Sequence, residues 1–232
     1  MNDLVLEKAL ILWDVDGTLV EMGRGREDKH HRAIELISER SISKQIRRGG
    51  QTDFEIISEL VRVNDIDPGV IPSALDLLDK LTNDELQRQP LLATPNAKLT
   101  IDEFAKRGYT NGLLTGNTRA RAIAKLDSAG LIKQINQLYF YDGQLAQNRY
   151  QLGQYVSESL SRLGIHDVLI VGDTPLDIQA SRSAGFSCVA VATGSFSSND
   201  LASYDPDFLI QDLFVGFDDL LRFIETRFKS DC

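Results

Sequence analysis

Residues 9–18 read ALILWDVDGT, and this stretch decides the fold. It begins with an unbroken apolar run, ALILW, which is typical of a strand buried on both faces of a parallel sheet. The run ends at DVDGT, where Asp and Gly favour a turn. In an open α/β sheet the carboxyl ends of the strands face a crevice, so the sequence predicts that Asp14 and Asp16 lie together in a polar site.

Further short runs rich in Val, Ile and Leu resemble the first one, and helical patterns fill the gaps between them. The runs cover residues 112–114, 168–171, 188–192 and 208–210. The helical patterns cover residues 99–107, 119–129, 150–163 and 176–184, and glycines close the last three at Gly130, Gly164 and Gly185. Glycine is preferred just beyond a helix C-terminus. This alternation predicts a doubly wound parallel, Rossmann-like α/β sheet.

The stretch from about residue 22 to residue 94 breaks this rhythm. It carries helical patterns at residues 27–39, 53–63 and 71–81 and no convincing strand. So much helix is too long for one crossover between neighbouring strands. We therefore predict an all-helical cap domain at residues 21–95, inserted into a core formed by residues 1–20 and 96–232. The hinges are expected near residues 20–25 and 93–96.

The composition excludes several classes of protein. The chain has 232 residues and a formal net charge of −9, which argues against a general nucleic-acid binder but not against a small anionic substrate. No apolar run approaches the roughly 18 residues of a membrane span. Residues 1–12 show no signal peptide, and Cys188 and Cys232 fit neither a disulfide framework nor a metal-binding spacing. We expect a cytoplasmic protein that is a monomer or a weak dimer.

A second acidic turn strengthens the case for a polar site. Residues 168–171 are followed by GDTPLD, which places Asp173 and Asp177 at another strand end. Taken alone, each acidic turn is explained as well by a solvated turn or a helix cap. Taken together, Asp14, Asp16 and Asp173 form an oxygen-rich cluster suited to Mg²⁺, because close carboxylates repel each other unless a cation intervenes.

Two further segments are candidates for binding phosphate. Thr115-Gly116-Asn117 follows a strand and precedes a helix, where backbone N–H groups can bind an anion. Arg149 opens the helix before residues 168–171. A plain helix N-cap for Thr115 and a surface position for Arg149 are the structural alternatives.

Together these segments resemble the four motifs of the haloacid dehalogenase superfamily, in order and in spacing, over nearly the whole chain. DVDGTL at residues 14–19 is similar to the first motif, Thr115 to the second, Arg149 to the third, and GDxxxD at residues 172–177 to the fourth. The resemblance is to its phosphatases with a helical cap, and GQTD at residues 50–53 looks like a segment of phosphoglycolate-phosphatase-like members. The third motif usually has lysine, so Lys125 and Lys133 are the fallback candidates for the role of Arg149.

The resemblance implies an Mg²⁺-dependent phosphatase acting on a small phosphorylated metabolite. Asp14 is then the nucleophile, which forms an aspartyl-phosphate, and Asp16 is the general acid and base. The Asp14 carboxylate, the Asp16 backbone carbonyl and Asp173 hold the metal, with Asp177 in support. The phosphate-binding residues are then Thr115, Gly116, Asn117 and Arg149. The candidate specificity residues of the cap are Arg47, Arg48, Gly50, Thr52 and Asp53.

Other functions use the same residue types. A phosphomutase of the same superfamily would return the phosphoryl group to a substrate. A phospho-accepting signalling domain would keep the phosphoryl group on Asp14, and a degenerate member would only bind its ligand. Related dehalogenases lack the second acid, so Asp16 favours phosphoryl transfer over dehalogenation.

Overall fold

The computed structural model describes residues 8–22 and 27–228, and its centre is a parallel sheet of six strands. The spatial order of the strands is β3-β2-β1-β4-β5-β6. Their bounds are Leu10–Trp13 (β1), Thr110–Leu114 (β2), Phe140–Tyr141 (β3), Val168–Gly172 (β4), Ser187–Val191 (β5) and Phe208–Ile210 (β6). The chain runs outward from β1 in both directions, so the strand order reverses between β1 and β4. Ligands bind at such a switch point in open α/β sheets.

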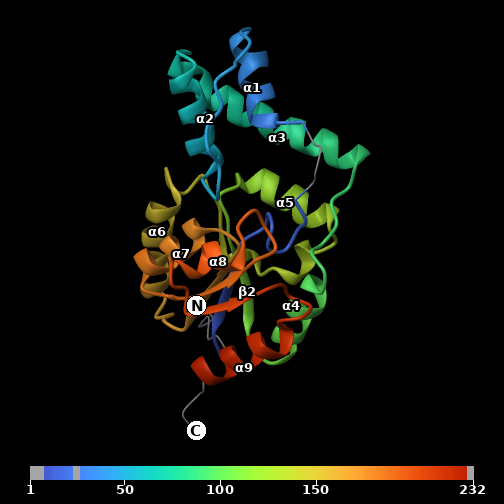
Figure 1. Ribbon diagram of the computed structural model, residues 1–232, viewed down its shortest axis with the longest axis vertical. Coiled ribbons are helices and arrows are strands. Elements are labelled where there is room, and N and C mark those ends of the chain that lie inside the picture. The colour runs from blue at the N-terminus through green and yellow to red at the C-terminus, as the bar shows by residue number, and fades with distance from the viewer. Residues whose placement is uncertain (1–7, 23–26, 229–232) are drawn as a thin grey trace.

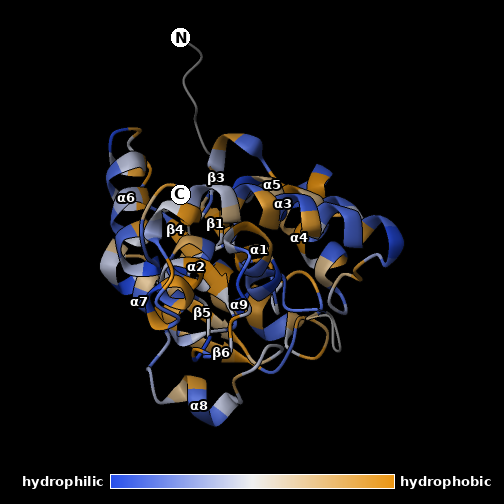
Figure 2. Cartoon of the chain, turned by 90° about the horizontal axis from the view of Figure 1, so that it is seen from above, coloured by the Kyte–Doolittle hydropathy of each residue, from blue (hydrophilic) through white to orange (hydrophobic). Residues whose placement is uncertain are grey.

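Helices cover both faces of this sheet. Successive residues of β1 point to opposite faces, so Ile11 and Trp13 join one apolar cluster while Leu10 and Leu12 join the other. Figure 2 shows the strands lying between helices that carry both hydrophilic and hydrophobic residues. The core helices are α4 (Ala97–Lys106), α5 (Arg119–Ser128), α6 (Arg149–Ser161), α7 (Pro175–Ala184), α8 (Ser198–Ala202) and α9 (Phe217–Arg227). The predicted doubly wound fold is confirmed.

The inserted segment is helical and has an apolar core of its own. It contains α1 (Lys29–Ser38), α2 (Asp53–Val63), the short 3₁₀ helix η1 (Pro68–Val70) and α3 (Ile71–Arg88). Ile34, Ile57, Leu60 and Leu78 are fully buried among these elements. In Figure 1 the three α-helices lie together at one end of the molecule, beyond α5. The predicted helical cap is therefore present.

The two chain segments that join cap and core run side by side. The amide of Glu21 donates to the carbonyl of Leu92, and the amide of Thr94 donates to that of Leu19, each over 2.9 Å. The hydroxyl of Thr94 also donates to the carbonyl of Thr18 over 2.6 Å. Residues 23–25 of the first predicted hinge, the first seven residues and Cys232 lie outside the described part. No described helix is long and apolar enough to cross a membrane.

Some elements differ from the sequence prediction. The prediction omitted β3, because a strand of two residues gives no periodic signal. Helix α3 continues to Arg88, seven residues beyond the predicted end, through the mostly polar stretch TNDELQR. Its outer turns expose most of this segment and bury only Thr82 and Leu86, so few apolar residues mark its helical period.

Candidate active site

Three carboxylates meet at the carboxyl ends of the two central strands. Asp14 follows β1 and Asp173 follows β4, and these strands pair with Trp13 opposite Val171. One carboxylate oxygen each from Asp14, Asp173 and Asp177 lie within 4.8 Å of one another. All three side chains are buried. Acids from separate parts of the chain are thus close enough to share one divalent cation.

The electrostatics of this cluster favour a bound cation. Burial raises the pKa of the Asp14 carboxyl; the nearby Arg149 guanidinium opposes this rise and the Asp16 carboxylate adds to it. Burial likewise raises the pKa of Asp173 well above its ordinary value, and the charges of Asp14 and Asp16 raise it further. A cation between these groups removes the repulsion, and Mg²⁺ prefers such oxygen ligands.

The oxygens that could bind a cation belong to the predicted metal ligands, and Asp177 is not one of them. Asp177 is already engaged, because its Oδ2 accepts hydrogen bonds from the amide and the hydroxyl of Thr174 over 3.0 and 2.7 Å. Its Oδ1 accepts from Arg149. By contrast, no hydrogen bond among the described residues reaches the backbone carbonyl of Asp16. Asp14 and Asp173 are less engaged, because among the described residues only their Oδ1 atoms accept hydrogen bonds, from Arg149 over 3.4 Å and from the Thr18 hydroxyl over 3.3 Å. Their Oδ2 atoms and the Asp16 carbonyl therefore remain available to a cation.

Arg149 bridges two of the acids. It is the first residue of α6, and only 2% of it is exposed. Its Nη1 donates to Oδ1 of Asp14 and to the carbonyl of Leu114, each over 3.4 Å, while Nη2 donates to Asp177. Its Nε is buried without a partner among the described residues. A surface position is excluded, and the structure brings this residue to the nucleophile candidate while Lys133 remains exposed.

The loop between β2 and α5 also faces the acids. Thr115 is fully buried, and its hydroxyl oxygen accepts a hydrogen bond of 2.9 Å from Nδ2 of Asn117. The N-cap of α5 is Thr118, whose hydroxyl accepts from the amide of Arg121 over 3.3 Å. The alternative role of Thr115 as a helix cap is therefore excluded.

Asp16 has close partners of its own in the core. Nζ of Lys125 lies 2.5 Å from its Oδ2, and Nδ2 of Asn117 donates to the same oxygen over 2.8 Å. Burial raises the pKa of this carboxyl, but Lys125, Arg121 and Asn117 together outweigh burial, so the pKa is lowered. Lys125, a fallback for the third motif, thus contacts Asp16, whereas Arg149 contacts Asp14.

The cap lies directly on this loop, and cap and core together line a cavity of about 320 Å³. The amide of Asp53 donates to the carbonyl of Gly116 over 2.8 Å. A Cβ atom at Gly116 would lie 2.4 Å from the carbonyl oxygen of Gln51, so only glycine fits there. On the other side, Gly50 (φ +94°) is so close to Thr174 that a Cβ would lie 2.3 Å from its Oγ1.

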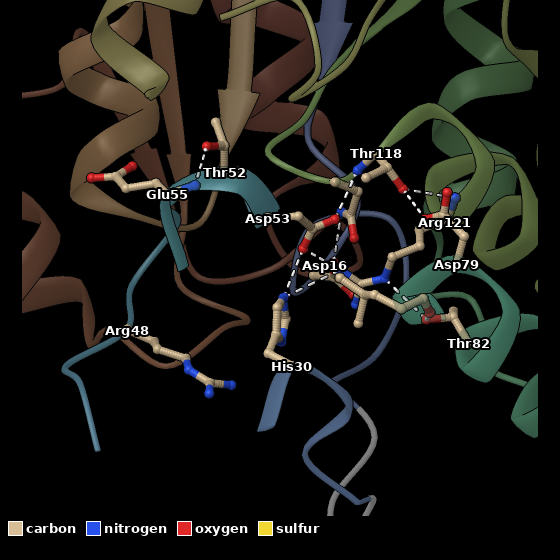
Figure 3. Close-up of polar contacts among 12 residues, drawn as sticks. Asp16, His30, Arg48, Thr52, Asp53, Glu55, Asp79, Thr82, Thr118 and Arg121 are labelled. Atoms are coloured by element: carbon tan, nitrogen blue, oxygen red, sulfur yellow. Dashed lines mark hydrogen bonds and ion pairs between the residues drawn. The ribbon is translucent and has the colours of Figure 1, made fainter. Parts of the chain in front are cut away.

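Asp53 is the centre of a buried network that joins the cap to α5 (Figure 3). Its Oδ1 pairs with Arg121 and lies 2.8 Å from Nε2 of His30, while its Oδ2 accepts from the amide of Thr118 over 2.8 Å. Nε of Arg121 donates to the hydroxyl of Thr82 over 3.0 Å. Burial raises the pKa of Asp53, but Arg121 and His30 outweigh it and hold this pKa far below its usual range.

The other predicted specificity residues take different positions. Arg48 lines the cavity and donates to both carboxylate oxygens of Asp28, over 3.0 and 2.7 Å. Arg47 is exposed and does not line the cavity. Thr52 caps α2 through the amide of Glu55 and donates to the carbonyl of Gln147 over 2.9 Å. The structure thus gives Arg47 and Thr52 no contact with the cavity.

The family model for haloacid dehalogenase-like hydrolases matches residues 11–191, which is most of the chain. The protein belongs to this family. The predicted superfamily membership is therefore confirmed, and so is the expectation of a hydrolase.

The chain is 23% identical to a phosphoglycolate phosphatase of Yersinia pseudotuberculosis over 218 residues, which cover 91% of this chain and 90% of that one. It is 27% identical to the pyrophosphatase PpaX of Oceanobacillus iheyensis over 52% of this chain and 56% of that one. It also resembles a crystal structure of a predicted phosphoglycolate phosphatase from Haemophilus somnus, with a TM-score of 0.68 and 18% identity over 95% and 99% of the two chains. The last likeness shows the fold alone.

Several residues at the site of this haloacid dehalogenase-like hydrolase are not apparent from its sequence motifs. Arg121 and His30 complete the contacts of Asp53, and no motif points to either residue. The available signal was the spacing of Arg121 and Lys125. Residues four apart share one helix face, so these two cations follow the Thr115 loop on a single side of α5.

Proposed function

We propose that the protein is an Mg²⁺-dependent phosphatase that hydrolyses a small phosphorylated metabolite through an aspartyl-phosphate at Asp14. The observation that carries this proposal is the meeting of the Asp14 and Asp173 carboxylates at the ends of β1 and β4. A buried guanidinium, Arg149, stands beside the same carboxylates. The curated relatives are named as phosphatases, which supports the same activity.

The first step is transfer of the phosphoryl group to the enzyme. An oxygen of Asp14 attacks phosphorus, the bond from phosphorus to the ester oxygen breaks, and Asp16 gives a proton to the departing oxygen. Arg149, Thr115 and the loop at Gly116 and Asn117 orient the phosphoryl oxygens and neutralise their charge. Asp14, Asp173 and the Asp16 carbonyl would hold Mg²⁺, which would neutralise charge between the two anionic reactants.

The second step returns the enzyme to its starting state. Asp16, now ionised, accepts a proton from a water molecule that attacks phosphorus. The bond between phosphorus and the Asp14 oxygen breaks, and inorganic phosphate leaves. Asp177 holds Arg149 in place through a direct ion pair.

The cavity favours a substrate with a second acidic group. Arg48 of the cap lines it and pairs with Asp28, and Arg121 and Lys125 of α5 line it and pair with Asp53 and Asp16. Such cations can bind a carboxylate or a second phosphate. Its volume of about 320 Å³ is at the small end for ligand pockets. A phosphorylated small acid such as phosphoglycolate fits both features, and the Yersinia relative is named for that substrate.

The remaining expectations belong to this proposal. The core comprises residues 1–20 and 96–232, and the cap comprises residues 21–95. The protein acts in the cytoplasm as a monomer or weak dimer, on a soluble metabolite rather than on nucleic acid or a membrane. Arg48, Gly50 and Asp53 are the cap residues nearest to substrate.

A phosphate-release assay tests the function. The purified protein is given a panel of small phosphorylated acids with Mg²⁺, beside an Asp14→Asn variant and an excess of chelator. We expect release from at least one ester by the wild type, and none by the variant or with chelator. Full activity in Asp14→Asn would contradict the mechanism. Isomerised product without free phosphate would instead indicate a phosphomutase, and a long-lived phosphorylated Asp14 without turnover would indicate a signalling domain.

A further inference from the structure

Lys125 is buried in α5 with its ammonium group against Asp16. Only 9% of its side chain is exposed. Nζ lies 2.5 Å from Oδ2 of Asp16 and donates to Oδ1 of Asn117 over 2.7 Å. A buried ammonium group is costly unless its charge is paired and its hydrogen bonds are made. These contacts therefore restrict Lys125 and both of its partners to one arrangement.

Asn117 closes a triangle with these two residues. Its Nδ2 donates to Oδ2 of Asp16 over 2.8 Å and to the hydroxyl of Thr115 over 2.9 Å. Oδ2 of Asp16 thus receives two donors, whereas no described residue donates a hydrogen bond to its Oδ1. One carboxylate oxygen is held, and the other is left to exchange a proton.

The helix that carries Lys125 is itself fixed from the cap side. Arg121 lies one turn earlier on the same face and pairs with Asp53. The amide of Thr118, the N-cap of the helix, donates to the same carboxylate over 2.8 Å. Lys125 therefore projects toward Asp16 from a turn whose position is set by contacts with the cap.

We propose that Lys125 is a positioning residue that holds Asp16 in place for proton transfer to the leaving group. The inference rests on the proposed phosphatase function. In the first step the ester oxygen keeps the electron pair of the broken bond and takes its proton from Asp16. An alkoxide leaves poorly without that proton, whereas p-nitrophenolate is stable as an anion. Loss of Lys125 therefore affects the two kinds of ester differently.

The test compares kcat/KM of the wild type and of Lys125→Met on an alkyl phosphate hydrolysed by the wild type and on p-nitrophenyl phosphate. The ratio kcat/KM reports steps up to the first irreversible one, which is the phosphorylation of Asp14. General acid catalysis contributes about 10²–10⁴-fold, so we expect a loss of that order on the alkyl ester and a loss below about tenfold on the aryl ester. Lys125→Arg keeps the charge and the donors and recovers part of the alkyl activity.

Lys106→Met is the matched control. Lys106 is an exposed lysine of α4 that pairs only with Glu103 of its own helix among the described residues. We expect this variant to keep both activities. Equal losses with both esters in Lys125→Met would overturn the proposal, because a purely structural role affects the two substrates alike.

If Lys125→Met does not fold, as a melting curve would show, Lys125→Gln takes its place in the test. Glutamine keeps an amide donor. In Lys125→Gln, kcat/KM should fall less than in Lys125→Met, and it should again fall more for the alkyl ester than for the aryl ester. Equal losses on the two esters also count against the proposal. If the wild type releases phosphate from no member of the panel of phosphorylated acids, the phosphatase function itself fails, and the role of Lys125 with it. If the wild type hydrolyses both and the variants lose both equally, only the role of Lys125 is refuted.

Discussion

The backbone amide of Asp53, in the cap, donates a 2.8 Å hydrogen bond to the carbonyl oxygen of Gly116, in the core. Gly116 belongs to the loop that we propose as the phosphate-binding segment. The cap therefore contacts this loop directly, and not only through the two linkers. That contact ties the position of the start of α2 to the geometry of this loop.

Gly116→Ala should separate the cap from the loop. A Cβ atom would lie 2.4 Å from the backbone oxygen of Gln51, which cannot move as a flexible side chain does. We expect the free energy of unfolding to fall by about 1–3 kcal/mol, as in other overpacked sites. We also expect kcat/KM to fall. Gly69→Ala is the control, because its Cβ would be 3.4 Å from its nearest neighbour, an oxygen of Asp67. Similar behaviour of the two variants would refute this coupling.

Asp53→Asn should weaken the docking of the cap on α5. The variant leaves the guanidinium of Arg121, whose side chain is 8% exposed, without its counter-ion. Breaking a buried pair in this way costs about 3–5 kcal/mol, which urea unfolding measures. Glu59→Gln, an exposed acid on the same helix, is the control and should change the stability little.

The pKa of Asp53 determines how the stability difference between the wild type and Asp53→Asn depends on pH. Arg121 and His30 hold it far below its usual range despite burial, so the folded state releases this proton more readily than the unfolded state does. The stabilisation is therefore fully present above the ordinary aspartate pKa and is lost as the pH falls toward the lowered one. The stability difference between wild type and Asp53→Asn should shrink in acid. A difference that grows as the pH falls would contradict this assignment.

Much of the architecture could be predicted because a buried strand appears in the sequence as an unbroken apolar run. Leu10–Trp13 is apolar at every position, as expected for a central strand covered on both faces. Phe140–Tyr141 was missed because two residues carry no period, and the strand depends on its pairing with Leu113 and Leu114. The end of α3 was missed because its last turns bury few apolar residues.

Arg149→Met should abolish most of the activity. Arg149 contacts the carboxylates of both Asp14 and Asp177, and its Nε has no partner among the residues described. Removing one preorganised donor typically costs 10²–10³-fold in kcat, and we expect a loss of about that size here. Arg149→Lys keeps one charge and should retain more activity. Arg162→Met, an exposed position at the end of the same helix, should behave as the wild type. Activity of Arg149→Met near that of the control would exclude a role at the phosphoryl group.

Removal of the metal should destabilise the protein more at neutral than at acid pH. Burial and the neighbouring acids raise the pKa of Asp173, so the folded state binds more protons than the unfolded state between the ordinary pKa and the raised one. Stability of the metal-free protein then falls as the pH rises through that window. Mg²⁺ requires the ionised carboxylates, so its stabilising effect should be larger at about pH 7.5 than at about pH 5.

Melting temperatures with Mg²⁺ and with chelator measure this effect. At a Mg²⁺ concentration of 100 times Kd the stabilisation is about 2.7 kcal/mol. Asp173→Asn removes one repelling charge, so it should melt higher than the wild type in chelator and should not respond to Mg²⁺. An Mg²⁺ response equal to that of the wild type would place the metal elsewhere.

The acids of the site could be predicted, but their partners could not. Asp14 and Asp173 come together because parallel strands end at the same edge of a sheet, and that rule needs only the strand positions. Arg47 and Arg48 are neighbours in the sequence, yet only Arg48 reaches the cavity. The docking of whole helices decides which side of the cap faces the core. Local sequence patterns do not predict that docking.

The nucleophile is the central claim, and trapping it is the most direct test. The protein is mixed with a hydrolysed substrate and Mg²⁺, quenched in acid within one turnover, digested and analysed by mass spectrometry. We predict a phosphoryl group on the peptide that contains Asp14 in the wild type, and none on the same peptide from Asp14→Asn. Phosphate release by the wild type with no modified Asp14 peptide at any quench time, accompanied by turnover in Asp14→Asn, would contradict the account.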